Sequence, residues 1–318
     1  MQKAVLLYNP HSGRRRNLVT AVERGAAVLR EYCVEVTVVA TLSAAEAGQQ
    51  ARIAVAQGCD TVFACGGDGT IQDVAQGLVG TSAALAIIPL GTANVLAHDL
   101  GIPRDAVAAA HAALQASPLR VNVGRIQCRP REGPVVTRYF LSVVGAGQDG
   151  YLFHRLASTE KKTFGLAAYF LKAFQVWFTH KNVWFSAQIS AVGKPDLNPA
   201  AQKLTQLLAV RLHNFGSLLR DLAPGASLLR PDFRLVLFRT SSRWCYLLYV
   251  LRGLVGARWP VPGVELKRAD AIRLMPSGTS PVFIEADGEL LGQLPAEISI
   301  VHDALTLLVP ADFASRQP

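Results

Sequence analysis

The sequence predicts an α/β domain followed by a β-rich domain, and three observations carry this prediction. The first third of the chain alternates between apolar, β-branched segments and helical segments, an order typical of a parallel sheet covered by helices. After about Leu119, short strand candidates follow one another closely between Pro, Gly and charged turns, which favours antiparallel pairing. At 318 residues the chain is long enough to bury two hydrophobic cores.

The first domain supplies strands and helices in strict alternation. Its predicted strands are Ala4–Tyr8, Val34–Ala40, Thr61–Cys65 and Ala84–Pro89, and its predicted helices are Asn17–Tyr32, Ser43–Gln57 and Thr70–Leu78. The second part has predicted strands at Val121–Cys128, Tyr139–Val144, Val183–Ile189, Leu204–Leu212, Phe233–Phe238 and Val282–Ala286, with a helix at Phe164–Phe178. We therefore assign residues 1–120 to the α/β domain and 121–303 to the β-rich domain.

The composition narrows the classes of function. The formal net charge is +9, which indicates acidic partners such as nucleotide phosphates, nucleic acid or an anionic membrane surface. The five cysteines are scattered without CxxC or metal spacing, and the first apolar run is too short for a signal peptide, so we expect a reduced, cytoplasmic protein. No HExxH, GxSxG or recognised nucleic-acid-binding module is present, and we expect no nucleic-acid partner.

A glycine-rich loop follows the third predicted strand and opens a helix: Cys65-Gly-Gly-Asp-Gly-Thr70. Glycines let a phosphate approach backbone N–H groups at the positive end of a helix. The carboxylate of Asp68 would repel a bound phosphate unless a divalent cation bridges this carboxylate and a polyphosphate. The alternative is an ordinary glycine turn in which Asp68 caps the helix.

Two further loops are expected at the same edge of the sheet. Asn9-Pro-His-Ser-Gly-Arg14 follows the first predicted strand, and Pro89-Leu-Gly-Thr-Ala-Asn94 follows the fourth. In a doubly wound sheet such loops converge above the carboxyl ends of the strands, where ligands bind. Each of these loops alone would be interpreted as an ordinary turn, but three such loops at the same edge of the sheet indicate a binding site.

These motifs resemble the catalytic domain of diacylglycerol and sphingosine kinases, and most closely the bacterial diacylglycerol kinase-like lipid kinases. The resemblance is carried by Asn9-Pro-x-Ser-Gly13, Gly66-Gly-Asp-Gly-Thr70, Pro89-Leu-Gly-Thr-x-Asn94, Leu100-Gly-Ile-Pro103, Gly145-x-Gly147-x-Asp149 and Asp287-Gly-Glu289. It implies a Rossmann-like nucleotide-binding domain, a β-sandwich-like domain and an active site in the cleft between them. It also implies that residues 304–318 return to the first domain.

The resemblance further implies the residues of the site. The nucleotide contacts would be Asn9, Pro10, His11, Ser12, Gly13, Arg14, Thr41, Gly66, Gly67, Asp68, Gly69, Thr70, Ile71, Gln72, Gly91, Thr92 and Asn94. Asp68, Asp287 and Glu289 would be catalytic, with one carboxylate of the Asp287–Glu289 pair accepting the proton, and Asp68 and Glu289 would hold Mg²⁺. The alternative interpretation of Asp287-Gly288 is an ordinary surface hairpin without a catalytic role, because Asp-Gly is a strong turn signal.

Some positions depart from the family. An acidic Asp-Asp-Gly turn that can hold a structural Mg²⁺ is replaced by Leu229-Arg230-Pro231, with only Asp232 nearby, so that second metal site is in doubt. The usual Gly-Gly-Gly becomes Phe215-Gly-Ser-Leu, and Gln148 stands where a Phe is usual. These departures weaken any transfer of the lipid's identity.

The predicted activity is transfer of the γ-phosphoryl group of ATP, with Mg²⁺, to a hydroxyl of diacylglycerol or a related lipid in phospholipid biosynthesis. The lipid would be presented at the inner membrane surface, with the enzyme peripheral; whether it forms a homodimer stays open. Phe164–Phe178 and Ser241–Trp259 each combine aromatic residues with cations and could contact a membrane or a neighbouring sheet. The rival functions are an NAD kinase-like enzyme and a catalytically inactive lipid- or nucleotide-binding regulatory protein.

Overall fold

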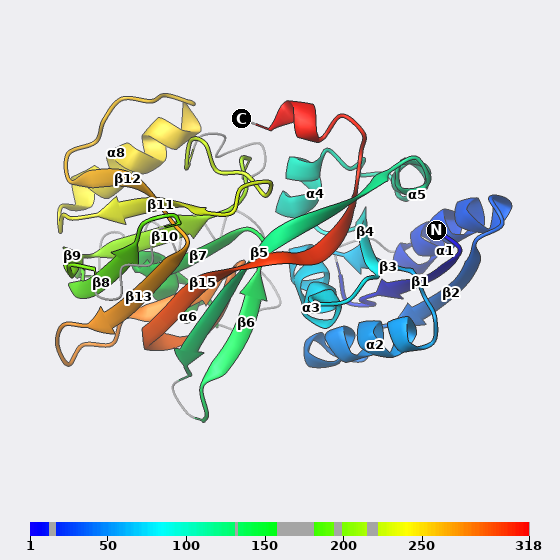
Figure 1. Cartoon of the computed structure of the whole chain (residues 1–318), viewed down its shortest axis with the longest axis horizontal. Helices are drawn as coiled ribbons and strands as arrows, with labels where there is room; N and C mark the ends of the chain where they lie inside the picture. Colours follow the sequence, from blue (N-terminus) through cyan, green and yellow to red (C-terminus); the bar gives the residue numbers. More distant parts are fainter. Residues whose placement is uncertain (13–16, 131–132, 158–180, 194–198, 215–221, 318) are drawn as a thin grey trace. The chain divides into compact units, whose positions relative to one another are not determined.

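The computed structural model describes residues 1–12, 17–130, 133–157, 181–193, 199–214 and 222–317 (Figure 1). The chain divides into two compact units. The first consists of Met1–Val123 and Val301–Pro318 with the short segment that begins at Asn214, and the second of Gly124–His213 and Leu218–Ile300. The fold class is confirmed, because the first unit is an α/β unit with a parallel sheet and the second is rich in antiparallel sheet.

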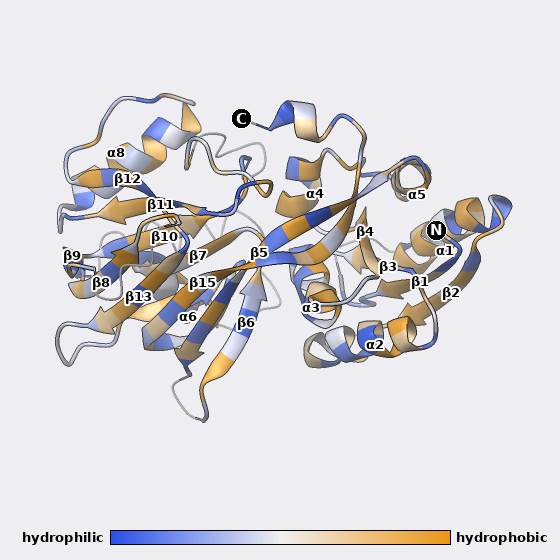
Figure 2. Cartoon of the chain, viewed as in Figure 1, coloured by the Kyte–Doolittle hydropathy of each residue, from blue (hydrophilic) through white to orange (hydrophobic). Residues whose placement is uncertain are grey.

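The first unit is built on a parallel sheet of order β15-β4-β3-β1-β2, in which every neighbouring pair is parallel. Its strands are β1 (Lys3–Tyr8), β2 (Glu35–Ala40), β3 (Thr61–Gly66), β4 (Ala84–Pro89) and the end of β15 (Glu289–Val309). β3 and β4 are buried along their whole length, as expected for parallel strands covered on both faces. Figure 2 shows these two strands as largely hydrophobic.

Helices cover this sheet, and two of them begin at a side-chain cap. They are α1 (Leu18–Glu31), α2 (Ala44–Ala56), α3 (Asp68–Leu78), α4 (Val95–Leu100) and α5 (Ala106–Leu114), followed near the chain's end by a 3₁₀ turn at Ala314–Arg316. α1 and α5 share one core with Leu6 and Phe63, while α2 and α3 contact each other and the strands (Figure 1). Ser43 caps α2 by accepting the Glu46 N–H at 3.3 Å, and Asp105 caps α5.

The second unit is antiparallel. Its strands are β5 (Ser117–Arg129), which begins in the first unit, β6 (Val136–Phe140), β7 (Val143–Gly147), β8 (Phe185–Ser190), β9 (Gln202–Leu204), β10 (Gln206–Val210), β11 (Phe233–Phe238), β12 (Val264–Ala269), β13 (Ala271–Pro276), β14 (Phe283–Ala286) and the start of β15. They run β12-β11-β10-β7-β14-β15, and β15 also pairs with β13, which continues to β8 and β9. Phe140, Phe185 and Phe233 from three separate strands meet in one core, so the sheet folds over itself as a sandwich does.

Two helices of the second unit are described, α6 (Gln148–Ala157) and α8 (Arg243–Leu254). The predicted helix at Phe164–Phe178 lies outside the described residues. α3 begins at Asp68, two residues before the predicted start, because Gly67 is its N-cap. None of the helices in the described ranges is long and apolar enough to cross a bilayer.

Candidate functional site

Three loops of the first unit meet at the carboxyl ends of β1, β3 and β4, as the sequence predicted. The loop after β1 touches the glycine-rich loop, since the hydroxyls of Ser12 and Thr70 share a hydrogen bond of 3.3 Å. The loop after β4 joins them through the Leu90 N–H, which donates to the Gly66 carbonyl at 2.8 Å. Segments up to 80 residues apart in sequence thus form one small surface of hydroxyls and backbone N–H groups.

Glycine is required where two of these loops touch. A Cβ built on Gly91 would overlap the Cα of Gly67, so any side chain there would push the loops apart. Asn94 closes the same loop from within: its side chain accepts the Gly91 N–H at 3.1 Å and donates to the Gly91 carbonyl at 2.8 Å. Asn94 has a φ of +50°, a left-handed conformation that Asn adopts more readily than most residues.

Asp68 ties the glycine-rich loop to the loop after β4. Its carboxylate accepts the Val95 N–H at 2.7 Å, at the first turn of α4. Burial raises the pKa of Asp68 above its ordinary value, and hydrogen bonds from the N–H groups of Asn94, Val95 and Leu96 oppose that rise. Asp68 therefore does cap a helix, but the helix is α4 and not the one that its own loop opens.

The remaining predicted nucleotide contacts fall into three groups. Thr41 lies beside the loop after β1, because its N–H donates to the Tyr8 carbonyl at 2.8 Å, and the His11 N–H donates to Asn9 at 2.9 Å. Ile71 and Gln72 are buried side chains of α3, whereas Thr92 is exposed. Gly13 and Arg14 lie outside the described residues.

The predicted acidic turn lies in the second unit, between β14 and β15. Ala286 pairs with Glu289 across the turn, and Asp287 and Gly288 have φ values of +48° and +85°. Two successive residues with positive φ are the signature of a two-residue type I′ hairpin, which explains the Asp-Gly pair. The backbone of Asp287-Gly288 therefore does form a hairpin turn, and the positions of the Asp287 and Glu289 carboxylates are set by the contacts of their side chains.

The Asp287 carboxylate is held by three backbone donors. The N–H groups of Leu141, Ser142 and Val143 donate to it at 2.8, 2.8 and 2.9 Å, from the connection between β6 and β7. The Glu289 carboxylate forms an ion pair with Arg138 at 3.1 Å and is partly exposed. The turn therefore presents two carboxylates in fixed orientations, one held by amides and one by a guanidinium group.

Beneath this turn lies a pair of carboxyl groups that the sequence reasoning did not assign, Asp149 and Glu285. Both lie against Gly145, where a Cβ would overlap the Asp149 carboxyl and come within 2.7 Å of the Glu285 carboxyl. The Glu285 side chain is only 1% exposed and accepts the Gly288 N–H at 2.9 Å, so it supports the acidic turn directly.

The Asp149 and Glu285 carboxyls both lie against Gly145, and burial raises the pKa of each. Burial, reinforced by the charge of Asp149, raises the pKa of Glu285 well above its ordinary value of 4.5. Asp149 was visible in the sequence as the end of Gly145-x-Gly147-x-Asp149, and Glu285 lies within β14, two residues before Asp287. Their contact joins two elements far apart in sequence, which no local pattern signals.

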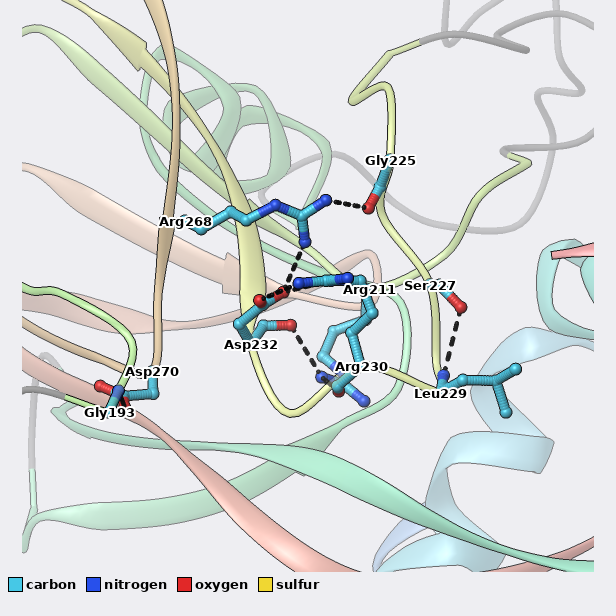
Figure 3. A network of polar contacts seen from close by, with 9 residues as sticks. All are labelled: Gly193, Arg211, Gly225, Ser227, Leu229, Arg230, Asp232, Arg268 and Asp270. Atoms are coloured by element: carbon cyan, nitrogen blue, oxygen red, sulfur yellow. Dashed lines mark hydrogen bonds and ion pairs between the residues drawn. The ribbon is translucent and has the colours of Figure 1, made fainter. Parts of the chain in front are cut away.

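The departure around Asp232 has a structural explanation (Figure 3). The buried Asp232 carboxylate forms ion pairs with Arg230 at 2.8 Å and Arg268 at 2.9 Å. Arg211, fully buried, donates to the backbone carbonyls of Leu228, Arg230 and Asp232, each at 3.0 Å. Burial lowers the pKa of Arg211 to about 10, and Asp232 opposes that shift.

Guanidinium groups therefore neutralise the Asp232 carboxylate. Within the described ranges, no group of three or more His, Cys, Asp or Glu side chains could hold a metal ion. The donor set at Asp232 does not fit a structural divalent cation, because both carboxylate oxygens already accept from arginines.

Comparison with known proteins places the chain among kinases. A sequence model of the diacylglycerol kinase catalytic domain matches residues 3–126. The chain is 26% identical to the diacylglycerol kinase of Bacillus subtilis (strain 168) over 322 aligned residues, which cover 99% of both proteins. A crystal structure of a diacylglycerol kinase from Bacillus anthracis str. Sterne shares the fold, with a TM-score of 0.66, 18% identity and 98% coverage of each chain. Yeast NADH kinase complexed with NADH is more distant, with a TM-score of 0.50, 14% identity and coverage of 97% of this chain and 83% of that chain.

The fold, the loop set and these relatives define a class of enzyme, a phosphotransferase with an alcohol group as acceptor. More narrowly, residues 3–126 match the diacylglycerol kinase catalytic domain, and the chain is similar over almost its whole length to bacterial diacylglycerol kinases.

Proposed function

We propose that this protein transfers the γ-phosphoryl group of ATP to a hydroxyl of diacylglycerol or a related lipid. The single observation that carries the proposal is the convergence of the Ser12, Gly66–Thr70 and Gly91–Asn94 loops at one edge of a parallel sheet. Backbone N–H groups and hydroxyls collected there are the groups that bind phosphate oxygens. The relative from Bacillus subtilis, a diacylglycerol kinase, supports a lipid acceptor.

Mg²⁺ is part of this proposal, and the residues at the loops fit it. In phosphoryl-transfer sites Mg²⁺ usually takes one or two carboxylates, several waters and phosphate oxygens, so a full protein cage is not needed. Asp68 supplies one half-buried carboxylate beside the proposed phosphate loops. Asp68 would hold the ion, which would neutralise the charge that develops on the transferred phosphoryl group.

The carboxylates of the acidic turn take the acceptor side of the reaction. Phosphoryl transfer to an alcohol needs a carboxylate that orients the hydroxyl and accepts its proton. Asp287 is fixed by three backbone donors and suits this positioning role, and Glu289 supplies a second negative charge, suited to Mg²⁺, next to Arg138. We assign Asp287 as the proton acceptor and Glu289 as its partner.

The acceptor also suggests where the enzyme works. A diacylglycerol-like lipid resides in a bilayer, and the net charge of +9 favours approach to an anionic leaflet. We propose a protein that acts from the cytoplasmic side as a peripheral enzyme of phospholipid biosynthesis.

The test is a transfer assay with γ-labelled ATP and Mg²⁺ against a panel of hydroxyl lipids in mixed micelles, with NAD as a further acceptor. Label in a glycerolipid supports the proposal and identifies the acceptor. Label in NAD would replace it with the NAD kinase alternative. Binding of ATP without transfer to any acceptor would favour a regulatory protein. The matched variants are Glu289→Gln, expected to reduce transfer at least tenfold, and Glu297→Gln, a comparably exposed carboxylate on the same strand, expected to leave it unchanged.

A further inference from the structure

Helix α8 carries an apolar surface on its outer side. The exposed large hydrophobic residues on and just after this helix, called here the α8 surface, are Trp244, Leu248, Val250, Leu251, Leu254, Val255 and Trp259. Trp244 and Val255 are two-thirds exposed, at 67% and 66%. Trp244, Leu248, Leu251 and Val255 follow the spacing i, i+4, i+7, i+11, which aligns them along one side of a helix.

The α8 surface is not the side of the helix that packs on the core, because the opposite side of α8 packs on the sandwich. Tyr246 stacks on Phe238 of β11 with ring centroids 4.3 Å apart, and Tyr249 meets the same ring edge-on at 5.3 Å. The buried Arg252 lies over the Tyr249 ring at 4.4 Å. Aromatic contacts fix the rotation of α8, and that rotation directs the leucines and valines into solvent.

The charged residues of the segment that contains α8 are all positive. Between Arg239 and Pro260 the chain contains four arginines and no aspartate or glutamate. Arg252 is buried beneath the helix and Arg239 pairs with Glu265 at 2.9 Å, whereas Arg243 and Arg258 are exposed at the two ends of the α8 surface. Figure 2 shows the mixture of hydrophobic and hydrophilic residues along this helix.

We infer that the α8 surface docks on a bilayer that contains anionic phospholipid, with the leucines and valines entering the acyl boundary and Arg243 and Arg258 at the headgroups. Soluble proteins seldom expose so much contiguous apolar surface without a partner. Apolar side chains flanked by Trp and Arg are typical of helices that lie in a membrane interface. This inference rests on the proposed function in one respect: docking on the bilayer would give the enzyme access to its lipid acceptor.

The first experiment measures binding alone. Sedimentation with vesicles of phosphatidylcholine plus phosphatidylglycerol, without nucleotide, compares wild type with Leu248→Gln/Leu251→Gln. The double variant is expected to bind at least tenfold more weakly. The control is Val19→Gln/Ile53→Gln, which removes two comparably exposed apolar side chains from α1 and α2 and should bind as wild type does. Arg243→Gln/Arg258→Gln is expected to weaken binding to these vesicles while leaving binding to pure phosphatidylcholine unchanged, because only the electrostatic part is removed.

The second experiment separates docking from catalysis. On a short-chain, micellar diacylglycerol the Leu248→Gln/Leu251→Gln variant should phosphorylate at the wild-type rate, and on the same lipid embedded in vesicles it should lose at least tenfold. If no lipid is ever phosphorylated, the sedimentation result still stands, so failure of the proposed function is distinguishable from failure of this inference.

Three results would overturn the inference. One is equal vesicle binding by wild type and the leucine variant when both show the same thermal unfolding midpoint. Another is equal loss of binding in the Val19→Gln/Ile53→Gln control. The last is a wild-type dimer in solution that the leucine variant converts to a monomer, because the α8 surface would then be covered by a second copy of the chain.

Discussion

Replacement of Asp287 by Asn should destabilise the second unit as well as affect catalysis. The carboxylate accepts three backbone N–H groups from Leu141, Ser142 and Val143. Asn also tolerates the φ of +48° at this position, so backbone strain does not contribute to the effect. The substitution changes charge and hydrogen bonding alone.

The magnitude follows from the two oxygens. Oδ1 accepts from Ser142 and Val143, and Oδ2 accepts from Leu141. An amide keeps one oxygen, so two bonds weaken from charged to neutral at about 1 kcal/mol each. The NH₂ group faces the Leu141 N–H, which leaves a partly buried donor without its acceptor at a cost of about 1–2 kcal/mol. The expected loss is about 3 kcal/mol in the free energy of unfolding.

Urea unfolding of wild type and Asp287→Asn, followed by far-ultraviolet circular dichroism, measures this loss at the midpoint of the transition. Glu289→Gln is the matched control, because it breaks only a partly exposed ion pair with Arg138 and should cost less than about 1 kcal/mol. Equal midpoints for wild type and Asp287→Asn would refute the structural role of the three amide bonds. Any kinetic defect of that variant could then be read as catalysis alone.

The other predictions concern three further places in the chain. Because the raised pKa of Glu285 penalises its ionised form, the contribution of this side chain to stability should be fully present below its ordinary pKa of 4.5 and be lost as the pH rises towards the raised value. The Glu285→Gln variant, compared with wild type by thermal unfolding across pH, should remove this loss, gaining up to about 1.4 kcal/mol per pH unit relative to wild type. Parallel pH curves for the two proteins would contradict the raised pKa of Glu285. Asp232→Asn should lower the free energy of unfolding by about 2 kcal/mol, because the partly exposed Arg230 and Arg268 lose their counter-charge. EDTA should leave the unfolding midpoint of nucleotide-free wild type unchanged. A drop with EDTA that Mg²⁺ reverses would show a divalent cation in this part of the fold after all. Gly91→Ala should weaken ATP binding at least tenfold in calorimetry, because the new Cβ overlaps Gly67. Gly278→Ala, whose new Cβ points into open space, should bind ATP as wild type does. Equal affinities of wild type and Gly91→Ala would place the ATP site elsewhere.

The sequence predicts the first unit well because its signals are local. Each apolar, β-branched run became a parallel strand, and each polar or glycine-rich loop after a strand lies at the carboxyl edge. The contact of Ser12 with Thr70 follows from this arrangement, since parallel strands bring their carboxyl ends to one edge. The geometry of Asp68 does not follow, because the donor to its carboxylate is 27 residues away on α4.

The second unit is predicted less completely because its signals come from tertiary contacts. β12, β13 and β15 were not anticipated: β12 alternates charged with apolar residues and is only half-buried, a weak pattern. The Asp149–Glu285 pair and the amide donors to Asp287 each join residues more than 130 positions apart. The orientation of α8 is set by contacts with Phe238, so the sequence alone left the α8 surface undecided between core and membrane.

The most direct test of the central claim is whether γ-labelled ATP, with Mg²⁺, labels a diacylglycerol in micelles and whether Asp68→Asn abolishes the transfer. The amide of this variant can still accept the Val95 N–H and keep the two loops joined, but it lacks the charge that Mg²⁺ needs. A phosphorylated lipid is expected with wild type, and transfer at least a hundredfold slower is expected with a fully folded Asp68→Asn. Transfer at the wild-type rate by that variant, or no labelled lipid from a wild-type protein that binds ATP, would contradict the central claim.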